Sequence, residues 1–367
     1  MSSMETTLMF LKVAIVLMGL LATVPIMLFV ERRGSALIQN RLGPNRMGPF
    51  GLFQAACDVI KFIFKEDVAP GHVNKFYYTI APWIAVIPAF MTFAVIPFAG
   101  PLMIHGSEVH FQIANLDVGI LYCFSVASLG VYGIIMAGWS SNNKYSLLGA
   151  LRSSAQMISY ELTLGLSIIG LVMVFKSIKL GEIALAQGET LVTIAGINIP
   201  KWGIFIQPVG FILFLISVFA ETNRLPFDLP EGESELIAGY HLEYGSMRFA
   251  LFMMAEFINM AVASGLLATL FFGGWQLFPG TSIVVHAIAN LATTTGIFPH
   301  EEIITALFQG ITFVIKVAFF MWFFVWVRWS LPRFRFDQLM SLGWKVLFPL
   351  ALINVFVTGI LIYNGVL

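Results

Sequence analysis

The stretch Leu8–Val30, LMFLKVAIVLMGLLATVPIMLFV, decides the fold class of this chain. It is longer than the roughly 20 apolar residues that a helix needs to cross a bilayer. Glu5 precedes it and Arg32 and Arg33 follow it, whereas a cleaved signal peptide carries its basic residues before the apolar stretch. We therefore predict an uncleaved first span whose N-terminus lies outside the cytoplasm.

The composition of the whole chain indicates an integral membrane protein. Apolar residues make up 58% of the chain and charged residues 11%, whereas ordinary soluble domains contain about 25% charged residues. The 35 phenylalanines show that the apolar excess comes from large side chains and not from an Ala/Gly-rich repeat. The net charge of zero provides no polycationic face for nucleic acid.

Seven further apolar stretches complete the prediction of an all-α integral membrane protein with about eight transmembrane helices. They are Thr79–Ile104, Val118–Trp139, Met157–Phe175, Trp202–Ala220, Phe249–Phe272, Ile303–Val327 and Val346–Tyr363. The first of these holds Pro82, Pro88, Pro97 and Pro101, so we expect it to be bent or partly unwound near its ends. The chain is predicted to form a single polytopic membrane domain, residues 1–367.

The distribution of lysine and arginine predicts the orientation. With the N-terminus outside, most basic residues fall in cytoplasmic connections, and only Lys176, Lys179 and Lys201 fall in the outer ones. Thr281–Phe298 is apolar enough to be a ninth span, but a crossing there would place the arginines after Val327 outside. We therefore interpret it as an outer interfacial or re-entrant segment, and predict that both termini are periplasmic.

The first cytoplasmic loop, residues 31–78, contains a predicted amphipathic helix over residues 51–66. Gln54, Asp58, Lys61 and Lys65 recur at spacings of four, three and four, which makes one narrow polar stripe on an otherwise apolar helix. Such a helix serves either as a surface anchor or as one wall of an amphiphilic binding chamber.

Several ionisable residues have unusual settings. Glu161, Glu256 and Lys316 fall well within predicted spans, where a charge is costly and usually faces a protein interior or a water-filled path. The connection over residues 221–248 is acidic, which fits either a solvated loop or a functional one. Each intramembrane residue could instead make a structural hydrogen bond between helices.

No redox or metal centre is predicted for this chain. Cys57 and Cys123 form no CxxC pair and cannot supply a four-cysteine cluster site. The six histidines are scattered along the chain and show no metal-ligand spacing.

Six motifs together resemble the ND1 family, whose members are the quinone-site membrane subunit of respiratory complex I, the NADH-quinone oxidoreductase. They are Pro226–Leu236 (PFDLPEGESEL) followed by Gly239; Gly51–Gln54 followed by Asp58, Lys61, Lys65 and Glu66; Glu31–Arg33; Arg41–Asn45; Glu221–Arg224; and Pro332–Met340. Cys57 is an uncommon residue at its position in the family. Arg46, after Asn45, looks more like the bacterial respiratory form, so the resemblance implies a bacterial inner membrane.

The resemblance implies a subunit that forms the lipid-side entrance and floor of a quinone chamber and couples quinone reduction to proton translocation. It implies no cofactor on this chain, because NADH, FMN and iron–sulfur clusters belong to partner subunits. The implied partners are the peripheral-arm subunits around the terminal cluster and small membrane-arm subunits. The quinone-binding candidates are Arg32, Asp58, Lys61, Arg224, Glu233, Arg328 and Arg333, and the proton-coupling candidates are Glu161, Glu221, Glu231, Glu233, Glu235, Glu256 and Lys316.

Other functions remain open at this point. Within the wider family, the chain could serve a membrane-bound hydrogenase, a formate-hydrogen-lyase or a ferredoxin-fed plastid-type complex. A stand-alone secondary transporter would be supported by internal inverted repeats, and the sequence shows none. A pure membrane anchor should tolerate the loss of Glu161 or Glu256.

Overall fold

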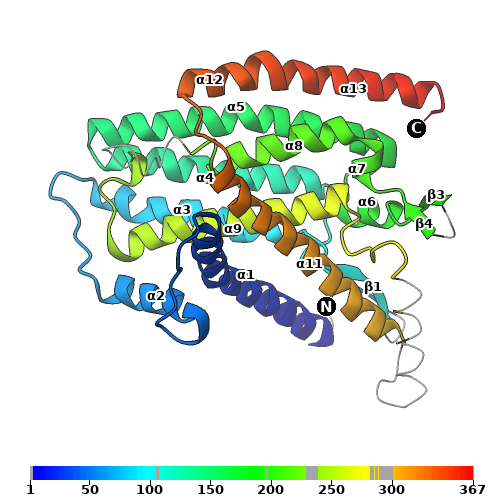
Figure 1. The fold of residues 1–367 in the computed structure, drawn as a ribbon, viewed down its shortest axis with the longest axis horizontal. Coiled ribbons are helices and arrows are strands. Elements are labelled where there is room, and N and C mark those ends of the chain that lie inside the picture. Colours follow the sequence, from blue (N-terminus) through cyan, green and yellow to red (C-terminus); the bar gives the residue numbers. More distant parts are fainter. Residues whose placement is uncertain are drawn as a thin grey trace.

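The computed structural model describes residues 3–104, 107–194, 197–228, 239–281, 285, 288 and 301–366. These residues form a bundle of helices that run back and forth along one axis (Figure 1). The helices that follow the predicted spans are α1 (Ser3–Ile38), α3 (Lys75–Phe93), α4 (Gly119–Ser140), α5 (Lys144–Phe175), α8 (Pro208–Glu221), α9 (Ser246–Phe271), α11 (Glu301–Ser330) and α13 (Phe348–Tyr363).

Within the described residues, seven helical segments are long and apolar enough to cross a membrane, which confirms a multi-pass, mostly helical protein. The last of them combines α12 (Phe336–Leu342), a π-helical stretch (Gly343–Leu347) and α13. Thr281–Phe298 lies almost wholly outside the described residues, and so do Glu231, Glu233 and Glu235.

The predicted span Thr79–Ile104 is helical only in its first part. Helix α3 ends at Phe93, and Ala99–Ile104 forms strand β1, which pairs antiparallel with β2 (Ser107–Phe111). Proline lacks the N–H that a helix interior needs, so Pro97 and Pro101 favour this early end. A second hairpin, β3 (Thr190–Ile194) with β4 (Ile197–Pro200), follows the short helix α6 (Leu180–Ala186).

The predicted span Trp202–Ala220 is interrupted. It consists of α7 (Gly203–Ile206) and the 14-residue α8, which are separated by Gln207; Pro208 is the first residue of α8. At a rise of about 1.5 Å per residue, α8 is about 21 Å long, which is shorter than the roughly 30 Å hydrocarbon core. The polar groups at the break are therefore inside the protein, where Gln207 is buried.

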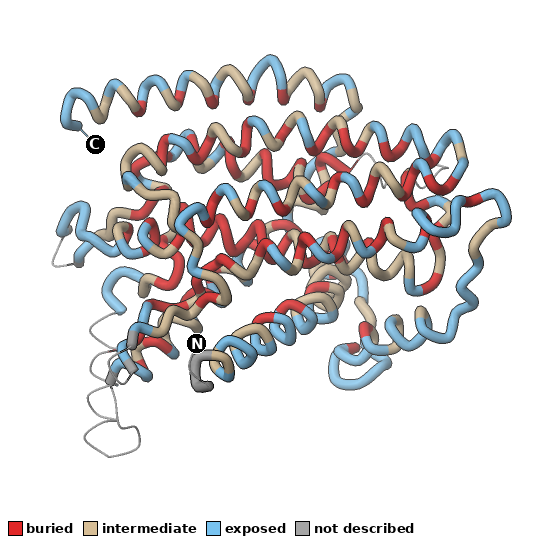
Figure 2. The backbone as a smooth tube through the Cα atoms, turned by 180° about the vertical axis from the view of Figure 1, so that it is seen from behind, coloured by how far each residue is buried: buried red, intermediate tan, exposed pale blue. Residues whose placement is uncertain are grey.

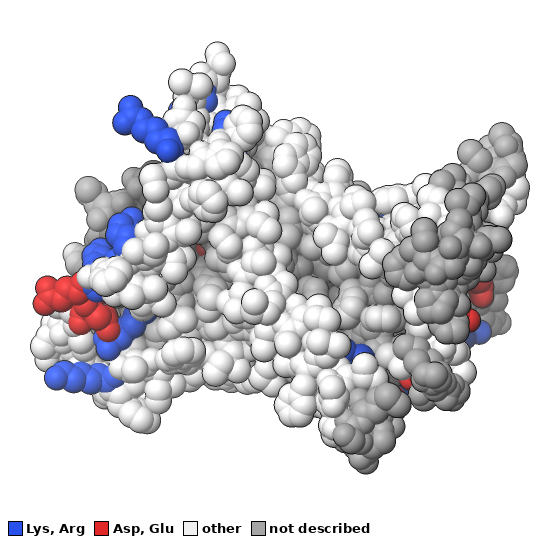
Figure 3. Space-filling model, turned by 90° about the horizontal axis from the view of Figure 1, so that it is seen from below, with Lys and Arg blue, Asp and Glu red and all other residues white. Residues whose placement is uncertain are grey.

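The two ends of the bundle differ. Both termini lie at the end that carries the hairpins, and the short helix α2 (Gln54–Phe64) lies at the opposite end (Figure 1). The face in Figure 3 gathers most of its visible charged side chains at one end and leaves a broad middle band without them. Such a band is the surface that lipid tails require.

The core lies between α3, α4, α5, α8 and α9. Helix α5 packs against α4, α8 and α13, while α9 packs against α3 and α11. Figure 2 shows buried residues concentrated along the central helices, whereas α13 at the C-terminal edge is largely exposed or intermediate. Small residues let the helices approach closely: a Cβ on Gly133 of α4 would lie 2.7 Å from the backbone nitrogen of Ala85 in α3.

Helix α2 exposes its apolar face and turns its polar face toward the rest of the protein, as a helix at the membrane surface does. The apolar side chains of Val59, Ile60, Ile63 and Phe64 are exposed. The carboxylate of Asp58 turns instead toward the protein, and its side chain is 15% exposed. In a bilayer, the exposed apolar face would contact lipid tails.

Candidate functional site

A cluster of four charged side chains lies where three helices and a loop meet at the α2 end of the bundle. The side chain of Arg224, which follows α8, is 7% exposed; its Nε forms an ion pair with Glu256 of α9 at 2.6 Å, and its Nη1 donates a hydrogen bond to Glu31 of α1 at 3.3 Å. Arg328 of α11 also donates to Glu31. The guanidinium of Arg224 further lies 4.7 Å from the ring centre of Phe257. Each buried charge is thus paired, as burial requires.

Two more ion pairs flank this cluster. Arg32 of α1 forms an ion pair with Asp58 of α2 at 2.6 Å, and Lys61 lies 3.7 Å from the same carboxylate. Arg333, between α11 and α12, donates to Asp228 at 3.2 Å. The Arg32–Asp58 pair holds the polar stripe of α2 against α1.

A cavity of about 380 Å³, called here the outer cavity, is lined by the four charged side chains of the cluster and by Arg32 and Asp228. Its polar lining includes Glu31, Arg32, Arg41, Arg224, Asp228, His241, Glu256 and Arg328, and its apolar lining includes Leu28, Phe249, Met253, Phe257 and Trp329. A pocket with apolar walls and a few converging polar groups suits a ligand that is itself amphiphilic.

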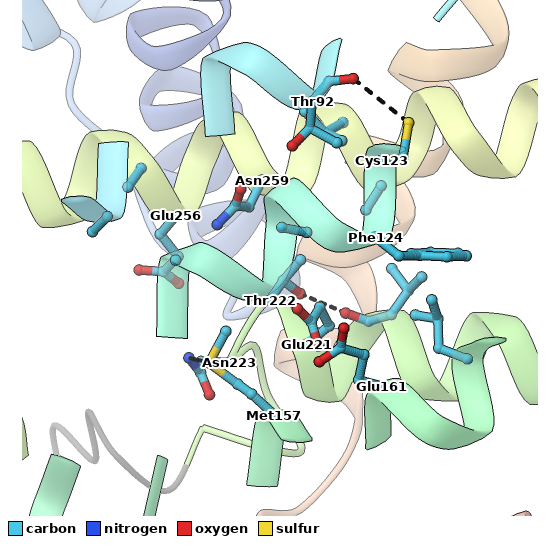
Figure 4. Close-up of a pocket in the computed structure, with 18 of the residues that line it drawn as sticks. Thr92, Cys123, Phe124, Met157, Glu161, Glu221, Thr222, Asn223, Glu256 and Asn259 are labelled. Carbon is cyan, nitrogen blue, oxygen red and sulfur yellow. Dashed lines mark hydrogen bonds between the residues drawn. The ribbon is translucent and has the colours of Figure 1, made fainter. Parts of the chain in front are cut away.

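A second cavity, called here the inner cavity, penetrates the bundle between α3, α4, α5, α8 and α9. Its volume is about 90 Å³, and its polar lining includes Glu161, Glu221, Asn223, Glu256 and Asn259. Figure 4 shows the carboxylates of Glu161 and Glu221 side by side and the Glu256 carboxylate further along the same pocket. The Ser128 hydroxyl of α4 is hydrogen bonded to Glu161.

Glu256 lines both cavities. Its carboxylate is paired with Arg224 on the outer side, while Asn259, one turn further along α9, faces the inner cavity. A carboxyl group is a proton donor and acceptor, and burial disfavours its ionised form. The arrangement therefore places a protonatable group between an amphiphilic pocket and a series of buried carboxyls.

The structure brings together most of the residues that the sequence singled out. Glu161, Glu221 and Glu256 share the inner cavity, while Arg32, Arg224 and Arg328 line the outer cavity. Asp58, Lys61 and Arg333 reach that cavity only through ion-pair partners or neighbours, and the Lys61 side chain is 66% exposed.

Lys316 lies elsewhere. Its buried ammonium donates to three backbone carbonyls just beyond the C-terminal end of α9, those of Phe272 at 2.7 Å, Gly274 at 2.9 Å and Gln276 at 2.6 Å. It also lies 4.9 Å from the ring centre of Trp202. This cation complements the negative end of the α9 dipole and lines neither cavity.

Two contributors were not identified from sequence. Glu31, which pairs with both Arg224 and Arg328, was quoted within a motif but given no role. Its signal was a carboxylate at the inner end of an apolar helix, directly before two arginines. Ser128, which bonds Glu161, gave no signal, because a serine within an apolar helix usually bonds its own backbone.

Comparisons with known proteins identify the family of this chain. The family model described as NADH dehydrogenase matches residues 11–359. The H subunit of the NADH-quinone oxidoreductase of Bdellovibrio bacteriovorus is 46% identical, with 98% of this chain and 97% of that protein covered. One such H subunit of Geobacter sulfurreducens is 45% identical over 95% of this chain and 94% of its own length, and that of Flavobacterium psychrophilum is 46% identical over 90% of each. The chain therefore belongs to the NADH dehydrogenase (ND1) family, as the multi-pass membrane H subunit of a bacterial NADH-quinone oxidoreductase.

Proposed function

We propose that the outer cavity is the part of a quinone chamber that this subunit contributes, with α2 and α1 forming its lipid-side entrance. The single observation that carries this proposal is a cavity of about 380 Å³ in which arginines and carboxylates converge beside apolar side chains. A quinone has a polar head and a long apolar tail, so it needs both kinds of lining. NADH, FMN and the iron–sulfur clusters would belong to partner subunits of the enzyme.

We propose further that the inner cavity carries the coupling between quinone reduction and proton translocation. Reduction of a quinone to a quinol consumes two electrons and two protons, so negative charge accumulates at the head until the protons arrive. Such charge competes with Glu31 and Glu256 for Arg224, which now pairs with both. As that pair weakens, Glu256 gains a proton more readily and can exchange it with the carboxyls of the inner cavity.

The loop carboxylates Glu231, Glu233 and Glu235 and the flanking Asp58, Lys61 and Arg333 are proposed to tune this charge balance. Glu233 is proposed for both quinone binding and coupling, as the sequence motif suggests. Neighbouring peripheral-arm subunits would close the chamber over this loop. The complex would lie in the inner membrane with both termini of this chain on the periplasmic side.

Replacing Arg224 tests the quinone site. In the assembled enzyme, Arg224→Lys keeps a positive charge but loses the planar fork that pairs two carboxylates at once. We expect the KM for a short-chain quinone to rise about tenfold, which corresponds to about 1.4 kcal/mol. NADH oxidation by a hydrophilic artificial acceptor should not change, because that reaction does not use this cavity.

Arg335→Lys is the matched control for this experiment. Arg335 pairs with Asp337 at 2.5 Å on the surface, where its side chain is 78% exposed, and it lines neither cavity. Its replacement should leave both activities at the parental level. Unchanged quinone kinetics in an assembled Arg224→Lys enzyme would remove Arg224 from the quinone site.

A further inference from the structure

A buried amide on α5 holds the chain segment that carries Glu221 and Arg224 and leads directly to Asp228. The side chain of Gln156 is fully buried, and its Nε2 lies 2.9 Å from the carbonyl oxygen of Ala220, 2.9 Å from that of Phe227 and 3.2 Å from Oδ1 of Asn223. These contacts join α5 to residues at the end of α8 and in the turn after it. One side chain therefore anchors an eight-residue segment, residues 220–227, at its start, middle and end.

The chemistry of the partners fixes which way this amide points. Backbone carbonyls only accept hydrogen bonds, so the NH2 group and not the oxygen must face Ala220 and Phe227. The Gln156 oxygen is buried and has no hydrogen-bond partner among the described residues. An unpaired buried acceptor costs free energy. The hydrogen bonds from the Gln156 NH2 group to Ala220 and Phe227 offset this cost.

Each anchored residue directly precedes a charged residue of the site. Ala220 is followed by Glu221, Asn223 by Arg224, and Phe227 by Asp228. Asn223 has a left-handed backbone with φ of 51°, which an asparagine adopts more readily than most residues. The segment leaves the helix at this point, so its position depends on such side-chain contacts more than on a helical ladder.

We propose that Gln156 is a positioning residue that sets where Glu221, Arg224 and Asp228 stand relative to the two cavities. Gln156 lies five residues before Glu161 on the same helix, which is about 7.5 Å along its axis. The amide therefore ties the turn that carries Arg224 to the helix that carries Glu161. This assignment rests on the proposed function: its effect on quinone kinetics rests on the outer cavity and its effect on proton translocation on the inner cavity.

Gln156→Met tests the assignment, because methionine has a similar volume but no donor. Gln207→Met is the matched control. Gln207 is another buried glutamine packed against α5; it donates to Thr358 at 2.8 Å and accepts from Asn354 at 3.2 Å, both in α13. Both variants should lower the thermal stability of the complex, since both remove buried hydrogen bonds.

The two variants should differ in function. In purified complex reconstituted into vesicles, we expect Gln156→Met to raise the KM for a short-chain quinone about tenfold and to lower the protons moved per NADH. Oxidation of NADH by a hydrophilic artificial acceptor should stay at the parental level. Gln207→Met should keep the parental KM and the parental proton ratio. Gln156→Glu should shift both quantities in the same direction as Gln156→Met and further, because it sets a carboxylate oxygen against two carbonyls.

Equal behaviour of Gln156→Met and Gln207→Met in KM and proton ratio would overturn the assignment and leave Gln156 as a packing residue. If Gln156→Met does not assemble, the same comparison is made with Gln156→Asn, whose amide is one methylene too short to reach all three acceptors. Glu256→Gln is measured in parallel. A normal proton ratio there with a raised KM in Gln156→Met would contradict the proposed coupling but keep the positioning role.

Discussion

Arg224 is the residue on which the site depends most. Its guanidinium joins the Glu31 carboxylate of α1 to the Glu256 carboxylate of α9. All three groups are largely shielded from solvent, so leaving any of these charges unpaired would cost a large amount of folding free energy. The partners are 193 residues and 32 residues away along the chain. A sequence motif can single out such an arginine, but the identity of its partners depends on how the helices pack.

Lys316 caps the C-terminal end of α9 by donating to the carbonyl oxygens that follow it. Lys316→Met would leave three carbonyl oxygens, one buried and two partly buried, without the ammonium that they now share. A lost partner costs about 1–3 kcal/mol for a buried polar group, so we expect a lower midpoint of thermal unfolding for the complex in detergent. The fraction that assembles should keep its proton ratio. A parental midpoint together with lost pumping would instead place Lys316 in the proton path.

At the scale of single elements, α2 is the helix whose role is most open to direct test. Its apolar face carries the exposed Ile63, and its opposite stripe carries Lys61. With Cys57 and Cys123 replaced by serine, a nitroxide spin label attached at Ile63→Cys should be reached by oxygen far better than by a water-soluble nickel chelate.

The same label at Lys61→Cys is the control and should show the reverse preference, because it lies on the polar stripe. Equal access of the nickel chelate to both positions would show that the exposed face of α2 contacts water or protein and not lipid. The proposed entrance between α2 and α1 would then have to be abandoned.

The positions of most membrane-spanning helices could be predicted from the sequence, but the interruptions within them could not. Hydropathy located the spans, because a bilayer demands long apolar helices whatever their neighbours. The prolines indicated that the helix would be bent or unwound near its ends. No local sequence pattern predicted that Ala99–Ile104 forms a strand paired with Ser107–Phe111. The break at Gln207 was also missed, because its polar group is paired by Thr358 and Asn354 from the far end of the chain.

The site was readable from sequence to a similar extent. Their position well within predicted spans singled out Glu161 and Glu256, and the two line one cavity. Depth alone could not show that Glu256 also faces the outer cavity, since this depends on the rotation of α9 about its axis. Glu31 gains its importance from Arg224 and Arg328, which lie 193 and 297 residues away along the chain.

At the scale of the whole molecule, the alternation of helices places the two termini and the two hairpins at one end of the bundle (Figure 1). The turn between α4 and α5 lies at the other end. A reporter fused to the C-terminus should therefore report the periplasm, and one inserted at Asn143 should report the cytoplasm. A cytoplasmic C-terminus would contradict the proposed orientation, and reporters on the same side would contradict the bundle itself.

The central claim is that the carboxyls of the inner cavity carry protons between quinone reduction and the membrane arm. Glutamine has nearly the shape of a protonated glutamate but cannot titrate, so it changes charge with little change in packing. Glu189→Gln is the control, because Glu189 is exposed and lines neither cavity.

The most direct measurement is the number of protons moved per NADH oxidised in vesicles that contain the reconstituted complex. We expect Glu161→Gln and Glu256→Gln to assemble, to keep NADH oxidation by a hydrophilic artificial acceptor and to lose most quinone-linked pumping, while Glu189→Gln pumps normally. Parental proton ratios in both Glu161→Gln and Glu256→Gln would contradict the account and leave these glutamates with a structural role.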